Sequence, residues 1–170
     1  MKKSRSSLFL IELTISILFF ALASAACIQL FVKAHLLDQK TQEANEAVVW
    51  SQNLAELWNA SNADILLVYN LLCEQYGSRQ SGFYMNNDGN AIFFFFDENW
   101  DFSDNISTRI TYRIDFVDYG YNAETGLHTA EITCIKNIFG KEDSGLVEYE
   151  TFYTLPLQYH AAIKGGYSHE

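Results

Sequence analysis

The chain has little proline, little glycine and few basic residues. One Pro and 9 Gly in 170 residues exclude a collagen-like repeat and argue against low-complexity linkers. Eleven Lys and Arg stand against 21 Asp and Glu, which gives a formal net charge of -10. Because such an acidic chain repels phosphate backbones, no nucleic-acid partner is expected. Apolar residues make up 49% of the chain, so it can bury a core of its own.

The sequence also lacks the residue spacings of a metal site or a catalytic site. Cys27, Cys73 and Cys134 show no C-x-x-C spacing. The four histidines share no ligand spacing and belong to no recognisable Ser-His-Asp arrangement. We therefore expect neither an enzyme nor a bound cofactor. A disulfide between Cys73 and Cys134 and a pair of free thiols are both open at this point.

An apolar run near the N-terminus is the most informative part of the sequence. Residues 8–32 are 25 residues with one charge, Glu12, and they follow Lys2, Lys3 and Arg5. As a helix they would span about 37 Å, enough to cross a hydrocarbon core of about 30 Å. The positive-inside rule then places the N-terminus in the cytoplasm and the chain beyond Lys33 outside. We expect a single-pass protein of the cell membrane.

Three alternatives compete for this segment. Ala23-Ser24-Ala25 has the small-x-small pattern of a signal peptidase site, and residues 24–27 resemble a lipobox that ends at Cys27. These patterns predict an exported lipoprotein or a secreted binding domain, and a third alternative is an unprocessed single-pass protein. Glu12 argues against an ordinary signal, because a carboxylate at a helix centre costs about 2.5–3.5 kcal/mol on insertion scales.

The start of the run resembles a known signal. Ser7-Leu8-Phe9-Leu10-Ile11-Glu12-Leu13, after a short basic leader, is similar to the prepilin-type cleavage and methylation signal of type IV pilins and type II secretion pseudopilins. The resemblance implies that residues 1–7 are a leader, that prepilin peptidase cuts between Ser7 and Leu8, and that Leu8 becomes the methylated terminus. It also implies that Glu12 is the assembly glutamate, which meets the α-amino group of the next subunit.

The resemblance further implies a place for the protein. Its partners would be membrane lipid, prepilin peptidase and other pilin or pseudopilin subunits, which it contacts through the N-terminal helix. It would pass from the membrane into an extracellular or periplasm-spanning filament, either a pilus or a secretion filament. Ser7 stands where the family usually has Gly, and residues 8–32 lack the proline of many major pilins. The second departure favours a minor pilin or a pseudopilin.

The helix is expected to continue beyond the membrane. Residues 8–32 would be its membrane half and residues 33–58 its outer half, since neither contains Pro or Gly. A separate short helix after the anchor is the alternative. An apolar stripe near a 3.6-residue period is expected to face the remaining domain, residues 59–170. The stripe comprises Leu37, Ala44, Val48, Ala55 and Trp58, and is widened by Trp50, Leu54 and Leu57.

The remaining domain shows one helical pattern and then alternating ones. A short helix is expected after a cap at Asn62 or Asp64 and before Gly77. Asn87-Asp88-Gly89 predicts a hairpin between strands at 83–85 and 91–96, and further strands are expected at 108–118, 127–139 and 146–155. The fold class is therefore α+β and pilin-like, with the long helix packed on an antiparallel sheet of four or five strands.

Three finer expectations concern single segments of this domain. The last strand should place four residues on one face, namely Tyr149, Thr151, Tyr153 and Leu155. The aromatic run at residues 93–96 should lie between the helix and another layer. An acidic loop offers oxygen ligands that could hold Ca²⁺, although a solvated loop without metal is the alternative. Its acids are Asp97, Glu98, Asp101 and Asp104.

Overall fold

The computed structural model describes residues 5–77, 82–103, 110–138 and 148–160, and only the backbone at residues 5–7, 138 and 148. Asp104, most of the leader and the outer ends of three expected strands (108–109, 139 and 146–147) lie outside these residues. The chain divides into two compact units, Met1–Glu43 and Ala44–Glu170. Helix α1 (Arg5–Ala60) contributes to both.

Helix α1 is unbroken over its 56 residues. This continuity confirms the expected single long helix and contradicts a separate short helix after the anchor. The physical reason is that no Pro or Gly interrupts the stretch. The helix ends two residues beyond Trp58, where Asn62 and Ala63 adopt left-handed φ angles of 54° and 61°. Residues of this conformation commonly end helices.

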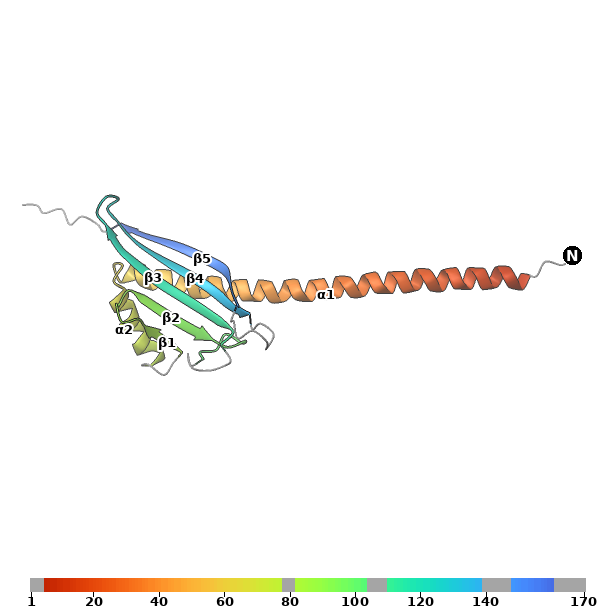
Figure 1. Cartoon of the computed structure of the whole chain (residues 1–170), viewed down its shortest axis with the longest axis horizontal. Helices are drawn as coiled ribbons and strands as arrows, with labels where there is room; N and C mark the ends of the chain where they lie inside the picture. Colours follow the sequence, from red (N-terminus) through yellow and green to blue (C-terminus); the bar gives the residue numbers. More distant parts are fainter. Residues whose placement is uncertain (1–4, 78–81, 104–109, 139–147, 161–170) are drawn as a thin grey trace, which may run out of the picture. The chain divides into compact units, whose positions relative to one another are not determined.

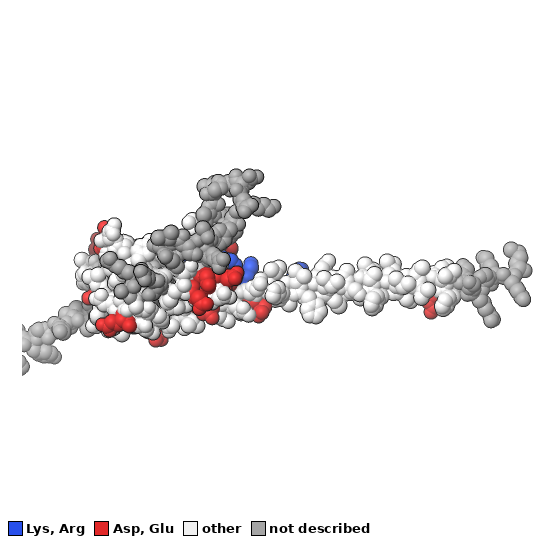
Figure 2. All heavy atoms as spheres, turned by 90° about the horizontal axis from the view of Figure 1, so that it is seen from below, with Lys and Arg blue, Asp and Glu red and all other residues white. Residues whose placement is uncertain are grey.

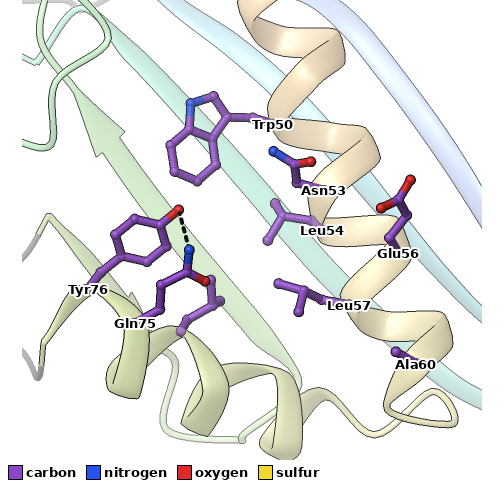
Figure 3. Close-up of a pocket in the computed structure, with 9 residues that line it drawn as sticks. Trp50, Asn53, Leu54, Glu56, Leu57, Ala60, Gln75 and Tyr76 are labelled. Atoms are coloured by element: carbon purple, nitrogen blue, oxygen red, sulfur yellow. Dashed lines mark hydrogen bonds between the residues drawn. The ribbon is translucent and has the colours of Figure 1, made fainter.

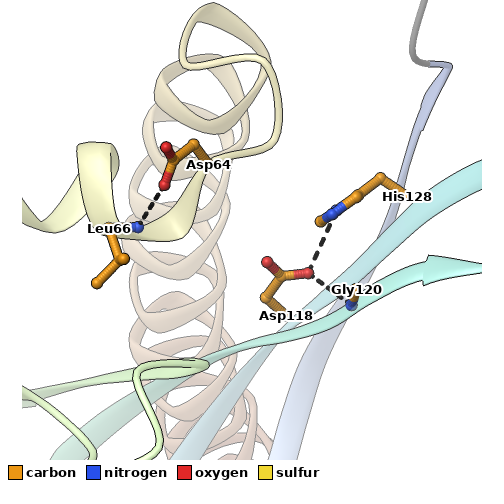
Figure 4. A network of polar contacts seen from close by, with 5 residues as sticks. All are labelled: Asp64, Leu66, Asp118, Gly120 and His128. Carbon is orange, nitrogen blue, oxygen red and sulfur yellow. Dashed lines mark hydrogen bonds and ion pairs between the residues drawn. The ribbon is translucent and has the colours of Figure 1, made fainter.

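Helix α2 (Ile65–Tyr76) follows this break. The Asp64 carboxylate caps it by accepting a hydrogen bond from the N–H group of Leu66 at 3.0 Å (Figure 4) and a second one from the N–H group of Leu67 at 3.2 Å. Of the two expected caps, Asp64 is therefore the one used. Gly77 ends the helix at φ 89°, as the sequence predicted.

The sheet has five antiparallel strands in the order β1-β2-β3-β4-β5 (Figure 1). They are β1 (Phe83–Met85), β2 (Ala91–Phe96), β3 (Tyr112–Asn122), β4 (Leu127–Ile138) and β5 (Glu148–His160). The β1–β2 hairpin is the predicted one, and its turn is held by the Asn86 side chain, whose Oδ1 accepts from Asn90 N and Ala91 N at 3.0 Å. In this order β5 is an edge strand, and it contains the single proline, Pro156.

Residues 44–60 of α1 cross one face of this sheet, which confirms the α+β class (Figure 1). The helix residues buried in the core are Ala47, Ser51, Leu54 and Trp58. The sheet residues with fully buried side chains are Ile92, Phe94, Phe96, Ile114, Phe116, Ile132 and Cys134. Helix α2 adds Ile65, Val68 and Leu72 to the same core. The core thus lies between the sheet and the two helices.

The buried stripe of α1 differs in part from the predicted one. Leu54 and Trp58 are buried as expected, but Leu37 is 67% exposed and Ala44 is also exposed. The prediction missed Ala47 and Ser51, because a small residue and a polar one carry little hydrophobic signal. Their small side chains permit a close approach: Ser51 Oγ lies 3.5 Å from Cys134 Sγ of β4.

The predicted face of the last strand is confirmed for Tyr153 and Leu155, which pack against the core, and is wrong for Tyr149 and Thr151. The pairing of β4 with β5 shifts between Cys134 and Ile135, so that Tyr153 lies opposite Cys134 and Thr151 lies opposite Ile135. Phe152 is the extra residue of this β-bulge. Thr151 therefore falls on the opposite face from Tyr153. Tyr149 also lies on that outer face, where its ring is 5.4 Å from the Arg113 guanidinium.

The aromatic run of β2 divides between the two faces of the sheet. Phe94 and Phe96 are fully buried toward α1, with ring centroids 6.2 Å and 5.0 Å from that of Trp50. Phe93 and Phe95 point the other way and contact Tyr84 of β1 at 5.3 Å and 5.7 Å. The prediction that residues 93–96 pack against the helix is confirmed for Phe94 and Phe96 only.

Candidate functional site

The N-terminal part of α1 presents its apolar side chains outward. Over residues 8–32 the exposure of the large apolar side chains runs from 46% at Leu13 to 77% at Phe31. Figure 2 shows this part of the helix as an almost uncharged surface, whereas acidic side chains gather on the second unit. By length and composition, α1 could span a membrane. Such a surface needs cover, from lipid or from another helix.

The hydroxyl groups of this segment are bonded within the helix itself. Thr14 Oγ1 donates to the carbonyl oxygens of residues 10 and 11 at 2.9 Å, Ser16 Oγ donates to that of Glu12 at 2.9 Å, and Ser24 Oγ donates to that of residue 20 at 2.8 Å. Internally bonded hydroxyls are compatible with lipid, which offers no partner. The Glu12 side chain is exposed, and no partner is found for it among the residues that the structure describes.

The expected processing residues lie at the start of the same helix. Ser7 and Leu8 are in the first turn of α1, and Leu8 is 72% exposed. The first N–H groups of a helix have no intrahelical acceptor, so this turn opens at the lowest cost. A peptidase that has to unwind the helix at the peptide bond between Ser7 and Leu8 would therefore break few hydrogen bonds.

Further along α1, an open apolar hollow of about 300 Å³ follows one stripe of the helix. It is lined by Cys27, Leu30, Phe31 and Ala34, which are spaced i, i+3, i+4 and i+7. Two of the four, Cys27 and Ala34, are small, and small residues on a helix face allow a second helix to approach closely. The arrangement suits helix packing rather than the enclosure of a small ligand.

The acidic loop after β2 uses its first carboxylate for local structure. Asp97 Oδ1 accepts hydrogen bonds from Asn99 N at 2.8 Å and from Asp101 N at 3.1 Å. Among the described residues, no three His, Cys, Asp or Glu side chains are grouped so as to hold a metal ion. Asp97, Glu98 and Asp101 are thus not grouped as metal ligands in the structure, and the fourth expected ligand is outside the described residues.

The three cysteines are free thiols in the structure. Cys134 is buried on β4 beside Ser51, whereas Cys73 is half-buried on α2. The disulfide that the sequence left open is thus not formed. Burial raises the pKa of the Cys134 thiol to about 11; the hydrogen bond with Ser51 lowers it by a smaller amount, and the Asp115 carboxylate adds a still smaller increase. A thiol of this kind stays protonated at neutral pH and is a poor nucleophile.

One histidine has an acidic neighbour, at the bulge of β3 (Figure 4). His128 Nδ1 lies 3.4 Å from Asp118 Oδ1, and the same oxygen accepts a hydrogen bond from Gly120 N at 2.8 Å. The register of β3 against β4 shifts between Asp118 and Gly120. The carboxylate thus closes the bulge and holds the imidazole, which is a structural role.

A groove of about 400 Å³ separates α1 from α2 (Figure 3). Its floor consists of Leu54, Leu57 and Leu72, and the rings of Trp50 and Tyr76 close one end with centroids 6.1 Å apart. Asn53, Glu56, Ala60 and Gln75 form its lips. In Figure 3 Glu56 stands on the outer lip, on the side of α1 away from α2.

The sequence did not predict this groove, although it predicted both helices. Trp50, Leu54 and Leu57 were assigned to the buried stripe, and Gln75 and Tyr76 carried no signal of a site. No protein-family model, no curated protein and no solved structure matches this chain.

Proposed function

We propose that this chain is a structural subunit of a type IV pilus or a type II secretion-like filament, as a minor pilin or a pseudopilin. Residues 8–32 would hold it in the membrane with the N-terminus in the cytoplasm, and prepilin peptidase would cut after Ser7. The signal-like sequence at residues 7–13 supports this function. So does the long helix that continues without a break into an α+β domain.

Glu12 is the observation that carries the proposal. It is the one charged side chain in an exposed apolar stretch whose hydroxyl groups are all bonded internally. A lone carboxylate in lipid is costly, and such residues commonly mark functional contacts. A neighbouring subunit, cut after Ser7, would offer the positive α-amino group of its Leu8. Buried ion pairs of this kind set register more than they add stability.

The rest of the segment suits a bundle of such helices. Helices in lipid associate through close packing, because the lipid removes most of the hydrophobic drive. Residues 21–26 contain four alanines and one serine, and the apolar hollow at Cys27, Leu30, Phe31 and Ala34 lies on the following turns. The filament core would then be made of these helices, with the α+β domains outside it.

The first test is the mature N-terminus, determined by mass spectrometry of the protein purified from its membrane. We expect a methylated Leu8 in cells with prepilin peptidase and an intact leader in cells without it. A start at Ala26 would instead establish a secreted domain, and a lipidated Cys27 would establish a lipoprotein. Either result would overturn the proposal in favour of the exported binding protein.

The second test separates anchoring from assembly. Glu12→Ala should insert into the membrane as well as the unmodified chain, because it removes a charge, but it should not enter filaments. Thr14→Val is the matched control, since the Thr14 hydroxyl is bonded within its own helix and contributes nothing to a neighbour. Sheared filaments and membranes are compared by immunoblot. Equal amounts of Glu12→Ala and Thr14→Val in the filament fraction would refute the pairing role.

A further inference from the structure

The groove between α1 and α2 is open although its floor is apolar. Leu54 and Leu72 are each 1% exposed at its base, Leu57 is half-buried, and Tyr76 is 40% exposed at the closed end. A volume of about 400 Å³ has room for a few side chains of a partner segment but not for a whole helix. The charge on its lips is negative, because Glu56 is the one ionisable group there apart from the Tyr76 phenol.

A second uncovered surface lies on α1 just beyond the apolar run. Lys33, Leu36, Leu37 and Lys40 are spaced i, i+3, i+4 and i+7, so they form one stripe of the helix. We call this set the basic leucine stripe. Leu36 is 53% and Leu37 67% exposed, and both lysines are exposed. Lipid does not suit these leucines, because lysines bracket them on both sides.

We infer that the basic leucine stripe of one copy docks in the groove of a second copy, an inference that rests on the proposed filament. The two surfaces match in chemistry: leucines would cover the leucine floor, and lysines would meet one carboxylate and two aromatic rings. Ammonium groups bind both to carboxylates and to the faces of Trp and Tyr rings.

The two surfaces also match in length. Seven residues separate Lys33 from Lys40, about 10 Å along a helix. Six residues separate Trp50 from Glu56, about 9 Å along α1. When one lysine lies over the aromatic end, the other lies at the level of Glu56 along α1. Because the Glu56 carboxylate stands on the side of α1 away from α2, this lysine has to cross the outer face of α1 to meet it, while Leu36 and Leu37 cover the floor. The acidic domain, which repels other copies of itself, thereby gains an attractive contact with a neighbouring copy.

The direct test is photo-crosslinking of the full-length chain in cells that assemble it. A photoreactive amino acid at position 37 should join one copy to groove peptides of another copy, either 50–60 or 72–76. Mixed light and heavy isotope labels show that the two peptides come from different copies. The same group at position 49 is the control, since Val49 is exposed on α1 but does not line the groove.

Charge reversal tests the ion pair. Glu56→Lys should lower the crosslink yield about fivefold, the effect of losing one exposed ion pair. Adding Lys33→Glu or Lys40→Glu in the same chain should restore the yield in one of the two combinations, and which one gives the direction of the docked helix. Glu46→Lys is the matched control, because Glu46 is exposed outside the groove.

The outcomes separate this inference from the proposed function. Filaments with methylated Leu8 whose position 37 crosslinks to lipid, to another protein or to another part of this chain would overturn the docking and leave the function intact. An unprocessed chain that forms no filament would overturn both. If Glu56→Lys left the groove crosslinks unchanged, the ion pair would be refuted, and the proposed docking arrangement with it.

Discussion

Leu54 provides a quantitative test of how α1 is held on the sheet. Its side chain is 1% exposed, and its neighbours on the buried stripe include Ala47 and Ser51, which are too small to fill the space that it would vacate. Leu-to-Ala changes in such sites cost about 2–5 kcal/mol, because burial is lost and a cavity remains. We expect Leu54→Ala to lower the free energy of unfolding by about 3 kcal/mol.

The three tryptophans make this change measurable in the full-length chain in detergent micelles. Trp50, Trp58 and Trp100 all lie in the unit Ala44–Glu170, so tryptophan fluorescence reports its unfolding. For a domain of this size, about 3 kcal/mol corresponds to a fall in Tm of roughly 10 °C. Val49→Ala is the control: Val49 is 50% exposed on the same helix, so its cost should stay within about 0.5 kcal/mol. Equal midpoints for the two variants would refute the packing described above.

Three further predictions concern two glycines, Cys134 and Asp115, and they are tested by the same unfolding assay or by mass spectrometry. Gly82→Ala should cost about 2 kcal/mol or more, since its φ is +77° and a Cβ there would lie 2.8 Å from the Ser103 carbonyl oxygen; Gly126→Ala, at φ +70° in open space, should cost about 1 kcal/mol. Cys134 should resist iodoacetamide at pH 8 in the folded protein, because a pKa of about 11 leaves about one thiol in a thousand ionised, and rapid native alkylation would contradict this. Burial raises the pKa of Asp115 more than Arg113 lowers it, so its contribution to stability is full at low pH and falls as pH rises. The stability of the unmodified protein relative to Asp115→Asn should accordingly decrease as the pH rises above the ordinary pKa of an aspartate, 3.8, and an increase would contradict the burial argument.

Local signals predicted the elements of this fold well. The continuous helix followed from a stretch without Pro or Gly, the start of α2 from Asp64, and the first hairpin from Asn87-Asp88-Gly89. In each case a residue acts on its own backbone or on the next few residues. Such effects are carried by the sequence itself, without knowledge of the tertiary packing.

The failures came from contacts between distant segments. Ser51 is buried because β4 places the Cys134 thiol beside it, and a polar residue gives no such indication in a helical pattern. Thr151 left its predicted face because a β-bulge at Phe152 reset the alternation, and no local residue type marks that bulge. The groove likewise exists only through the packing of two helices. For the N-terminal segment the candidate residues came from a motif, so Ser7, Leu8 and Glu12 could be named without any tertiary structure.

The edge strand β5 affects whether copies of this protein aggregate when their local concentration is high. Among the described residues no strand pairs with the outer edge of β5, so this strand of 13 residues could pair with a strand of another molecule and extend the sheet. Pro156, near the middle of that strand, has no N–H to give, so an incoming strand would meet a gap in the ladder of donors. Replacing it by a residue with a backbone N–H would complete this row of donors. We expect that single change to make the protein more prone to aggregate.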